Sequence, residues 1–185
     1  MASVLPAYQE AVVAELRALD LETVDNIAKV LMEVHRAGGA WFTCGNGGSG
    51  ASAAHIVTDF VKSLEFHPRA MCLSDNQPLV LATSNDIDYA EVFTVPLRAW
   101  LKPEDAVIAI SGSGDSENAL RAVRFANERG ATTIGLCGSG GGKLAGLAQL
   151  PLVLGTKDMQ VIEDVHMCVL HMLFRRLREL DEMGR

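Results

Sequence analysis

Between residues 40 and 154, short apolar runs alternate with stretches of helical spacing, and this alternation constrains the fold more than any other feature. The apolar runs cover residues 40–44, 70–73, 106–110, 132–137 and 150–154. The helical stretches between them cover residues 52–62, 88–101, 116–129 and 142–148. Strands that are apolar along their whole length and separated by helices are typical of a parallel sheet covered on both faces. We therefore expect an α/β fold, a three-layer α/β/α sandwich with five parallel strands.

Helices are expected at both ends of this alternating region. The first 37 residues are predicted to form two helices, the second capped by Asp20 and ended by the Gly38-Gly39 pair. Residues 160–183 are predicted to form one long, apolar-rich helix. Because no repeat or linker interrupts the 185 residues, we expect a single domain over residues 1–185.

Composition narrows the class of protein. The net charge of −7 argues against nonspecific nucleic-acid binding, which needs a basic surface. No apolar run reaches the roughly 18 residues that span a bilayer, and no secretory signal is visible, so we expect a cytoplasmic protein without a membrane partner. None of the four cysteines forms a C-x-x-C motif, and we interpret all four as structural thiols.

Glycine- and serine-rich segments follow the strand-like runs, where parallel sheets bind their ligands. Residues 45–49 follow the first run, and residues 111–116 follow the third with Ser111, Ser113 and Ser116 beside two glycines. Close backbone approach at glycine and the free N–H groups of a helix start make an anion site. Three hydroxyls without a lysine suit a sugar phosphate. The alternative for either loop alone is an ordinary strand–turn–helix connection, in the second loop with Ser116 as N-cap.

Two nucleotide-binding motifs compete with this interpretation. Gly45, Gly47 and Gly50 match G-x-G-x-x-G, with Glu65 twenty residues after the first glycine. Glu65 precedes the second apolar run instead of closing it, so an NAD-dependent enzyme is the weaker alternative. Residues 138–143 resemble a phosphate-binding Walker loop but lack its first glycine and its Ser/Thr, so we reject ATP binding there.

Polar side chains interrupt two of the expected helices. His55 and Asp59 are four residues apart on one helix face, and Glu163 and His171 lie on the long C-terminal helix. Such groups could bind a metal, act as acid and base, or be hydrogen-bonded core residues. Eight residues of continuous helix separate Glu163 from His171 by about 12 Å. One metal therefore takes both only if the helix starts near Glu163 or the ligands come from different subunits.

Taken in order, these segments resemble the sugar isomerase (SIS) domain family, and within it the phosphoheptose isomerase group. The resemblance covers nearly the whole chain. The matching segments are Cys-Gly-Asn-Gly-Gly-Ser at 44–49, Asn85-Asp86, Ser-Gly-Ser-Gly-Asp-Ser at 111–116, Gly-Gly-Lys at 141–143, and residues 163–171. The resemblance implies a homotetramer with active sites at subunit interfaces, a sugar phosphate substrate and, as in several members, a zinc ion. The implied reaction converts sedoheptulose 7-phosphate to D-glycero-D-manno-heptose 7-phosphate through an enediol(ate).

Residue roles follow from the same resemblance. Asp59 stands where the family has its catalytic base, and His171 where it has the partner acid. The metal positions of the family fall on His55, Asp59, Glu163 and His171. The remaining positions are expected to contact substrate, the serine loop holding the phosphate: Asn46, Gly47, Gly48, Ser49, Asn85, Asp86, Ser111, Gly112, Ser113, Ser116 and Glu163.

Three residues depart from the family pattern. Asp59 replaces a Glu and is one methylene shorter, whereas Glu163 replaces a Gln and adds a carboxylate. Ser63 replaces an Arg near the substrate, beside Lys62, which is a poor substitute for a planar guanidinium. These changes leave a second function open: a noncatalytic SIS-domain sensor of phosphosugars or a protein-binding regulator, such as the family member that binds a replication initiator.

Overall fold

The computed structural model describes residues 3–138 and 140–184, so Ser139 of the glycine-rich loop at 138–142 lies outside the described residues. Its sheet has five parallel strands in the order β2-β1-β3-β4-β5. The strands are β1 (Ala40–Gly45), β2 (Arg69–Cys72), β3 (Ala106–Ser111), β4 (Thr132–Cys137) and β5 (Leu150–Val153). The expected three-layer α/β/α architecture is confirmed, and each strand lies within a residue of its predicted bounds.

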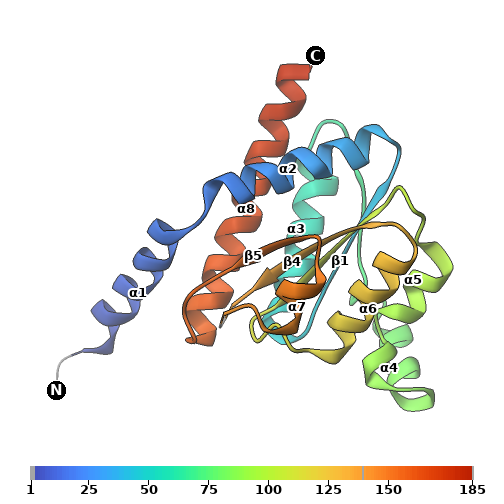
Figure 1. The fold of residues 1–185 in the computed structure, drawn as a ribbon, viewed down its shortest axis with the longest axis horizontal. Coiled ribbons are helices and arrows are strands. Elements are labelled where there is room, and N and C mark those ends of the chain that lie inside the picture. The colour runs from blue at the N-terminus through green and yellow to red at the C-terminus, as the bar shows by residue number, and fades with distance from the viewer. Residues whose placement is uncertain (1–2, 139, 185) are drawn as a thin grey trace.

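Helices cover both faces of the sheet, as Figure 1 shows. They are α1 (Val4–Ala18), α2 (Leu21–Arg36), α3 (Gly47–Ser63), α4 (Gln77–Asp86), α5 (Thr94–Trp100), α6 (Glu117–Glu128), α7 (Gly142–Leu147) and α8 (Met159–Gly184), with a short 3₁₀ helix η1 (Tyr89–Glu91). One apolar core lies between the sheet and α2, α3 and α8, and a second lies between the sheet and α5, α6 and α7. Alternation along β1 sends Trp41 into the first core and Phe42 into the second.

The flanking helices also form as expected. The Asp20 side chain accepts hydrogen bonds from the backbone N–H groups of Glu22 and Thr23, which confirms it as the cap of α2. The helix α8 is continuous and packs along α2 and α3. The first helix, α1, has no buried residue and projects from the body of the molecule beside α8 (Figure 1).

Three helix predictions need correction. The helix expected at residues 52–62 begins at Gly47, because the glycines after β1 already form its first turn. The helix expected at residues 88–101 is divided into η1 and α5. Helix α4 was not predicted; Asn76 caps it, and its weakly amphipathic sequence carries little helical signal. None of the helices described is long and apolar enough to cross a membrane.

Candidate functional site

Two helices that follow central strands lack a side-chain cap. The side chains of Ser3, Asp20, Asn76 and Asp88 each accept a backbone N–H at the start of another helix. Asn46 at α3 and Ser116 at α6 occupy the N-cap position, yet neither side chain caps its helix. Both helices follow strands of the sheet centre, so their first N–H groups remain available at the edge where ligands bind.

The serine loop gathers three hydroxyl groups at the start of α6. The Ser111 Oγ atom lies 3.5 Å from Ser113 Oγ and donates to Ser116 Oγ at 3.2 Å. The backbone N–H of Gly114 donates to Ser111 Oγ at 3.2 Å, and the N–H of Asp115 donates to Ser113 Oγ at 3.2 Å. Hydroxyls held this close to a positive helix end have the chemistry to bind an oxyanion. The structure thus brings together the three serines that the sequence predicted.

Gly114 fixes the turn of this loop. Its φ of +69° lies in the left-handed region, and a Cβ atom there would fall on the backbone carbonyl of Gly141. The loop after β4 also bonds to the serine loop through the Leu144 N–H, which donates to the Gly114 carbonyl at 2.9 Å. The two glycine-rich loops therefore support one another. Gly112 is constrained as well, because a side chain at this position would meet Met159 of α8.

A second pocket, of about 240 Å³, lies beside the start of α3. Its polar lining comes from Gly45, Asn46, Gly47, Ser74 and Tyr89. The Asn46 amide pairs with the Asn118 amide through two hydrogen bonds of 2.9 Å and accepts the Tyr89 hydroxyl at 2.8 Å. The pocket is therefore adjacent to the first turn of α6, which carries Asn118. Asn118 and Tyr89 were not predicted as site residues.

Four residues that were predicted to contact substrate lie outside the hydrogen-bonded group of Asn46, Asn118 and Tyr89. Asn85 and Asp86 are exposed at the end of α4, where the Asn85 amide donates to the Asp86 carboxylate at 2.7 Å. Gly48 and Ser49 lie in the first turn of α3, and Ser49 is buried. Their contact with substrate stays a prediction.

A carboxylate lies between two imidazoles farther along α3. Asp59 Oδ2 lies 3.3 Å from His55 Nε2 and 3.6 Å from His171 Nε2, and the two Nε2 atoms are 3.3 Å apart. A ligand atom of each side chain lies within 4.8 Å of the others. Two nitrogens and one oxygen are a typical set of three protein ligands for catalytic zinc. The residues present therefore fit a divalent cation.

Glu163 does not join this cluster within the chain. A Cβ at Gly48 would fall on the Glu163 carboxylate, which places that carboxylate against the start of α3. Because α8 is continuous from Met159, Glu163 and His171 are separated by about 12 Å of helix. His55 and Asp59 likewise lie two to three turns beyond Gly47, away from the start of α3.

A pocket of about 340 Å³ opens beside the cluster. It is lined by Asp59, His171, Phe174, Arg175 and Arg178, so two guanidinium groups share it with the carboxylate. Ser63, the position at which the resemblance expects an arginine, lies one turn after Asp59 at the end of α3. The positive charge in the pocket beside Asp59 therefore comes from two arginines of α8.

Two cysteines, Glu65 and His166 lie outside the two polar clusters. Burial raises the pKa of the Cys44 and Cys137 thiols, the latter to about 12, which agrees with their interpretation as packing residues. Glu65 lies between α3 and β2, ahead of the strand, as the argument against NAD required. His166 is buried, and burial lowers its pKa to about 4.

Comparison with known proteins agrees with this geometry. The family model for the SIS domain matches residues 7–138. The phosphoheptose isomerase of Trichlorobacter lovleyi is 33% identical over 153 residues, which cover 81% of this chain and 78% of that protein. The phosphoheptose isomerase of Crocosphaera subtropica is 36% identical over 139 residues, 74% of this chain and 71% of that protein.

A solved structure is similar over nearly the full chain. The phosphoheptose isomerase from Neisseria gonorrhoeae superimposes with a TM-score of 0.89 at 26% identity, covering 95% of this chain and 97% of that one. Sequence relatives and architecture thus lead to the same group. This chain belongs to the SIS domain family, and within it to the phosphoheptose isomerases.

Proposed function

We propose that this protein is a phosphoheptose isomerase that interconverts sedoheptulose 7-phosphate and D-glycero-D-manno-heptose 7-phosphate. One observation carries the proposal: three serine hydroxyls converge at an uncapped helix start, in a chain that also holds a carboxylate between two imidazoles. The first arrangement suits a phosphate ester, and the second suits proton transfer. The relatives named phosphoheptose isomerase support this assignment over a noncatalytic regulator.

The serine loop holds the substrate by its phosphate. Ser111, Ser113 and Ser116 donate to the phosphate oxygens, and the free N–H groups at the start of α6 add partial positive charge. Binding of the phosphate orients the substrate but takes no part in bond breaking, because the phosphate is unchanged by the reaction. The Asn46 loop next to it contacts the sugar hydroxyls.

Asp59 and His171 transfer the protons. Asp59 removes a proton from C1 of the ketose, giving an enediol(ate), and then delivers a proton to C2 to give the aldose. His171, within 3.6 Å of the Asp59 carboxylate, donates to and accepts from the oxygens at C1 and C2 as the negative charge moves between them. Arg175 and Arg178 add positive charge in the pocket beside them.

His55, Asp59 and His171 are the residues that would hold a zinc ion. When bound, such an ion supplies Lewis-acid stabilisation of a negatively charged oxygen. Glu163, the fourth expected ligand, would join from another subunit.

The active site is shared between subunits of a homotetramer in this proposal. Within one chain, the acid–imidazole cluster lies two to three helical turns from the start of α3, about 12 Å or more along that helix. A neighbouring chain that packs against α3 and α8 brings a second serine loop or cluster into reach. The proposal also places the protein in the cytoplasm.

The direct test is turnover. Purified protein with zinc and sedoheptulose 7-phosphate is followed by NMR, and we expect aldoheptose phosphate to appear. His171→Gln is expected to abolish turnover but to keep the stabilisation that inorganic phosphate gives to the wild type. Absence of turnover by the zinc-supplied wild type would overturn the assignment.

A further inference from the structure

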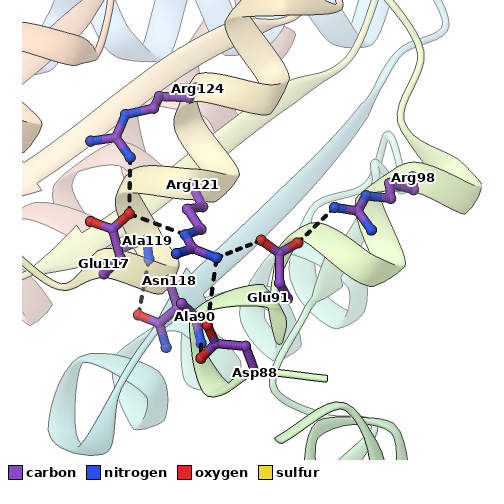
Figure 2. A network of polar contacts seen from close by, with 9 residues as sticks. All are labelled: Asp88, Ala90, Glu91, Arg98, Glu117, Asn118, Ala119, Arg121 and Arg124. Carbon is purple, nitrogen blue, oxygen red and sulfur yellow. Dashed lines mark hydrogen bonds and ion pairs between the residues drawn. The ribbon is translucent and has the colours of Figure 1, made fainter. Parts of the chain in front are cut away.

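Asn118 is a buried polar residue that the proposed mechanism does not use. It is 2% exposed and lies in the first turn of α6, two residues after Ser116. Its Oδ1 atom accepts from the backbone N–H of Ala119 at 2.9 Å, a contact visible in Figure 2, and from Asn46 Nδ2 at 2.9 Å. Its Nδ2 atom donates to Asn46 Oδ1 at 2.9 Å.

The backbone contact fixes the orientation of both amides. An N–H group can only donate, so the atom of Asn118 that faces Ala119 must be the carbonyl oxygen. The reciprocal pair then requires the nitrogen of Asn46 to face that same oxygen, and the oxygen of Asn46 to face the nitrogen of Asn118. Neither amide can rotate by half a turn without placing two donors or two acceptors in contact.

Tyr89 completes the set of contacts to Asn46. Because the Asn46 oxygen is fixed as an acceptor, the Tyr89 hydroxyl donates to it at 2.8 Å. That oxygen then accepts two hydrogen bonds, which is its capacity, while the second N–H of Asn46 has no partner among the residues that the structure describes. The Tyr89 oxygen, having donated its proton, keeps lone pairs that can accept.

Ion pairs hold the helix of Tyr89 against the helix of Asn118. Figure 2 shows Arg121 of α6 among three carboxylates: its Nη1 lies 2.8 Å from Glu91 of η1 and 3.7 Å from Asp88, and its Nε lies 3.1 Å from Glu117. Arg98 of α5 contacts the other oxygen of Glu91 at 2.7 Å. The donor on Asn46 and the acceptor on Tyr89 therefore belong to one connected scaffold at the pocket.

We propose that Asn118 is a positioning residue that locks Asn46 as a hydrogen-bond donor toward the sugar, and that Tyr89 accepts from a sugar hydroxyl in the same pocket. A hydroxyl group suits this pair because its oxygen can accept from Asn46 while its proton goes to Tyr89. This inference rests on the proposed function and adds the polarity of the sugar contacts to it.

Kinetics with sedoheptulose 7-phosphate test the proposal through two variants of one residue. Asn118→Ala frees the Asn46 amide, and we expect kcat to fall about tenfold, the effect of one lost hydrogen bond. Inorganic phosphate should still raise its melting temperature as it does for the wild type. Asn118→Asp keeps the oxygen that faces Ala119 but sets its second oxygen against Asn46 Oδ1, so kcat is expected to fall as in Asn118→Ala, while its charge two residues from Ser116 also raises KM.

The tyrosines supply a matched control. The chain has two tyrosines. Tyr89→Phe is expected to lower kcat/KM about tenfold. Tyr8→Phe, which removes the hydroxyl of α1 that donates a hydrogen bond to Asp164 of α8, is expected to keep the wild-type value. Wild-type kinetics for Asn118→Ala, or loss of phosphate stabilisation together with kcat in that variant, would overturn the inference.

Crystal structures of the variants separate this inference from the proposed function. Asn118→Ala should lose the Tyr89–Asn46 contact, which is 2.8 Å long in the wild type. An unchanged Asn46 in Asn118→Ala would refute the positioning role even for a protein without turnover. A wild type that lacks turnover while Asn46 moves as expected would refute the proposed function alone.

Discussion

Acid pH is expected to destabilise this protein through one buried histidine, His166. The residue is 1% exposed in the core between α8 and the sheet, and neither ring nitrogen has a hydrogen-bond partner of good geometry among the described residues. Burial lowers its pKa from 6.5 to about 4, and a weak contact with the backbone of Cys137 opposes the shift. Below pH 6.5 the unfolded chain therefore binds a proton that the folded chain does not.

The size of the effect follows from the shift. At about 1.4 kcal/mol per pKa unit, His166 removes about 3 kcal/mol from the free energy of unfolding as the pH falls from 6.5 to about 4. Above pH 6.5 His166 is neutral in both the folded and the unfolded chain, so this loss is absent. His35, whose pKa burial also lowers, acts in the same direction but is more exposed, so its share is smaller.

Urea unfolding of the wild type and His166→Leu at several pH values isolates the contribution. Both proteins are compared at one concentration, because assembly also affects stability. Between pH 6.5 and about 4, the free energy of unfolding of the variant is expected to fall by about 3 kcal/mol less than that of the wild type. The exposed histidine variant His67→Asn should follow the wild type. Equal pH dependence in His166→Leu and the wild type would refute the reasoning.

Three further predictions concern the serine loop, the assembly of subunits and the first helix, α1. Gly114→Ala forces a side chain into a left-handed φ against a backbone carbonyl, and we expect it to cost at least about 1–2 kcal/mol in urea unfolding and to remove phosphate stabilisation. Mixed tetramers of two inactive variants, Ser113→Ala and His171→Gln, should recover about a quarter of wild-type turnover if each site combines two chains, and none if one chain supplies both groups. Tyr8 donates to an α8 carboxylate, which raises its pKa to about 12, so its ultraviolet titration should lie about two units above that of free tyrosine. The stabilising effect of this contact is present below pH 10 and lost toward pH 12, and a normal tyrosine titration in a Tyr89→Phe background would contradict it.

Local sequence signals were sufficient for the sheet and for most of its helices. Apolar runs such as residues 106–110 are buried on both faces, so their hydrophobicity alone marks them as central strands. The start of α3 was missed because glycine disfavours helix, although Gly47 and Gly48 form its first turn next to the site. The helix α4 was missed because it lacks an apolar stripe and buries little.

The candidate site was predictable where its residues are adjacent in sequence. The serines of one loop and the i,i+4 pair His55 and Asp59 are grouped by spacing alone, whereas His171 was predicted only through the family resemblance, and the structure brings it beside that pair across two helices. Asn118 carried a weak signal, a polar residue among buried ones just after the serine loop, but its pairing with Asn46 joins positions 72 residues apart. Tyr89 reaches Asn46 only because η1 is held against α6, an arrangement of tertiary contacts that no local pattern indicates.

A crystal structure of the assembled protein with sedoheptulose 7-phosphate tests the central claim most directly. The account predicts that the phosphate lies among the hydroxyls of Ser111, Ser113 and Ser116, with C1 and C2 of the sugar at Asp59 and His171 of one of the chains. A phosphate bound outside the serine loop, or a sugar whose reacting carbons lie far from every such acid–imidazole pair, would contradict it.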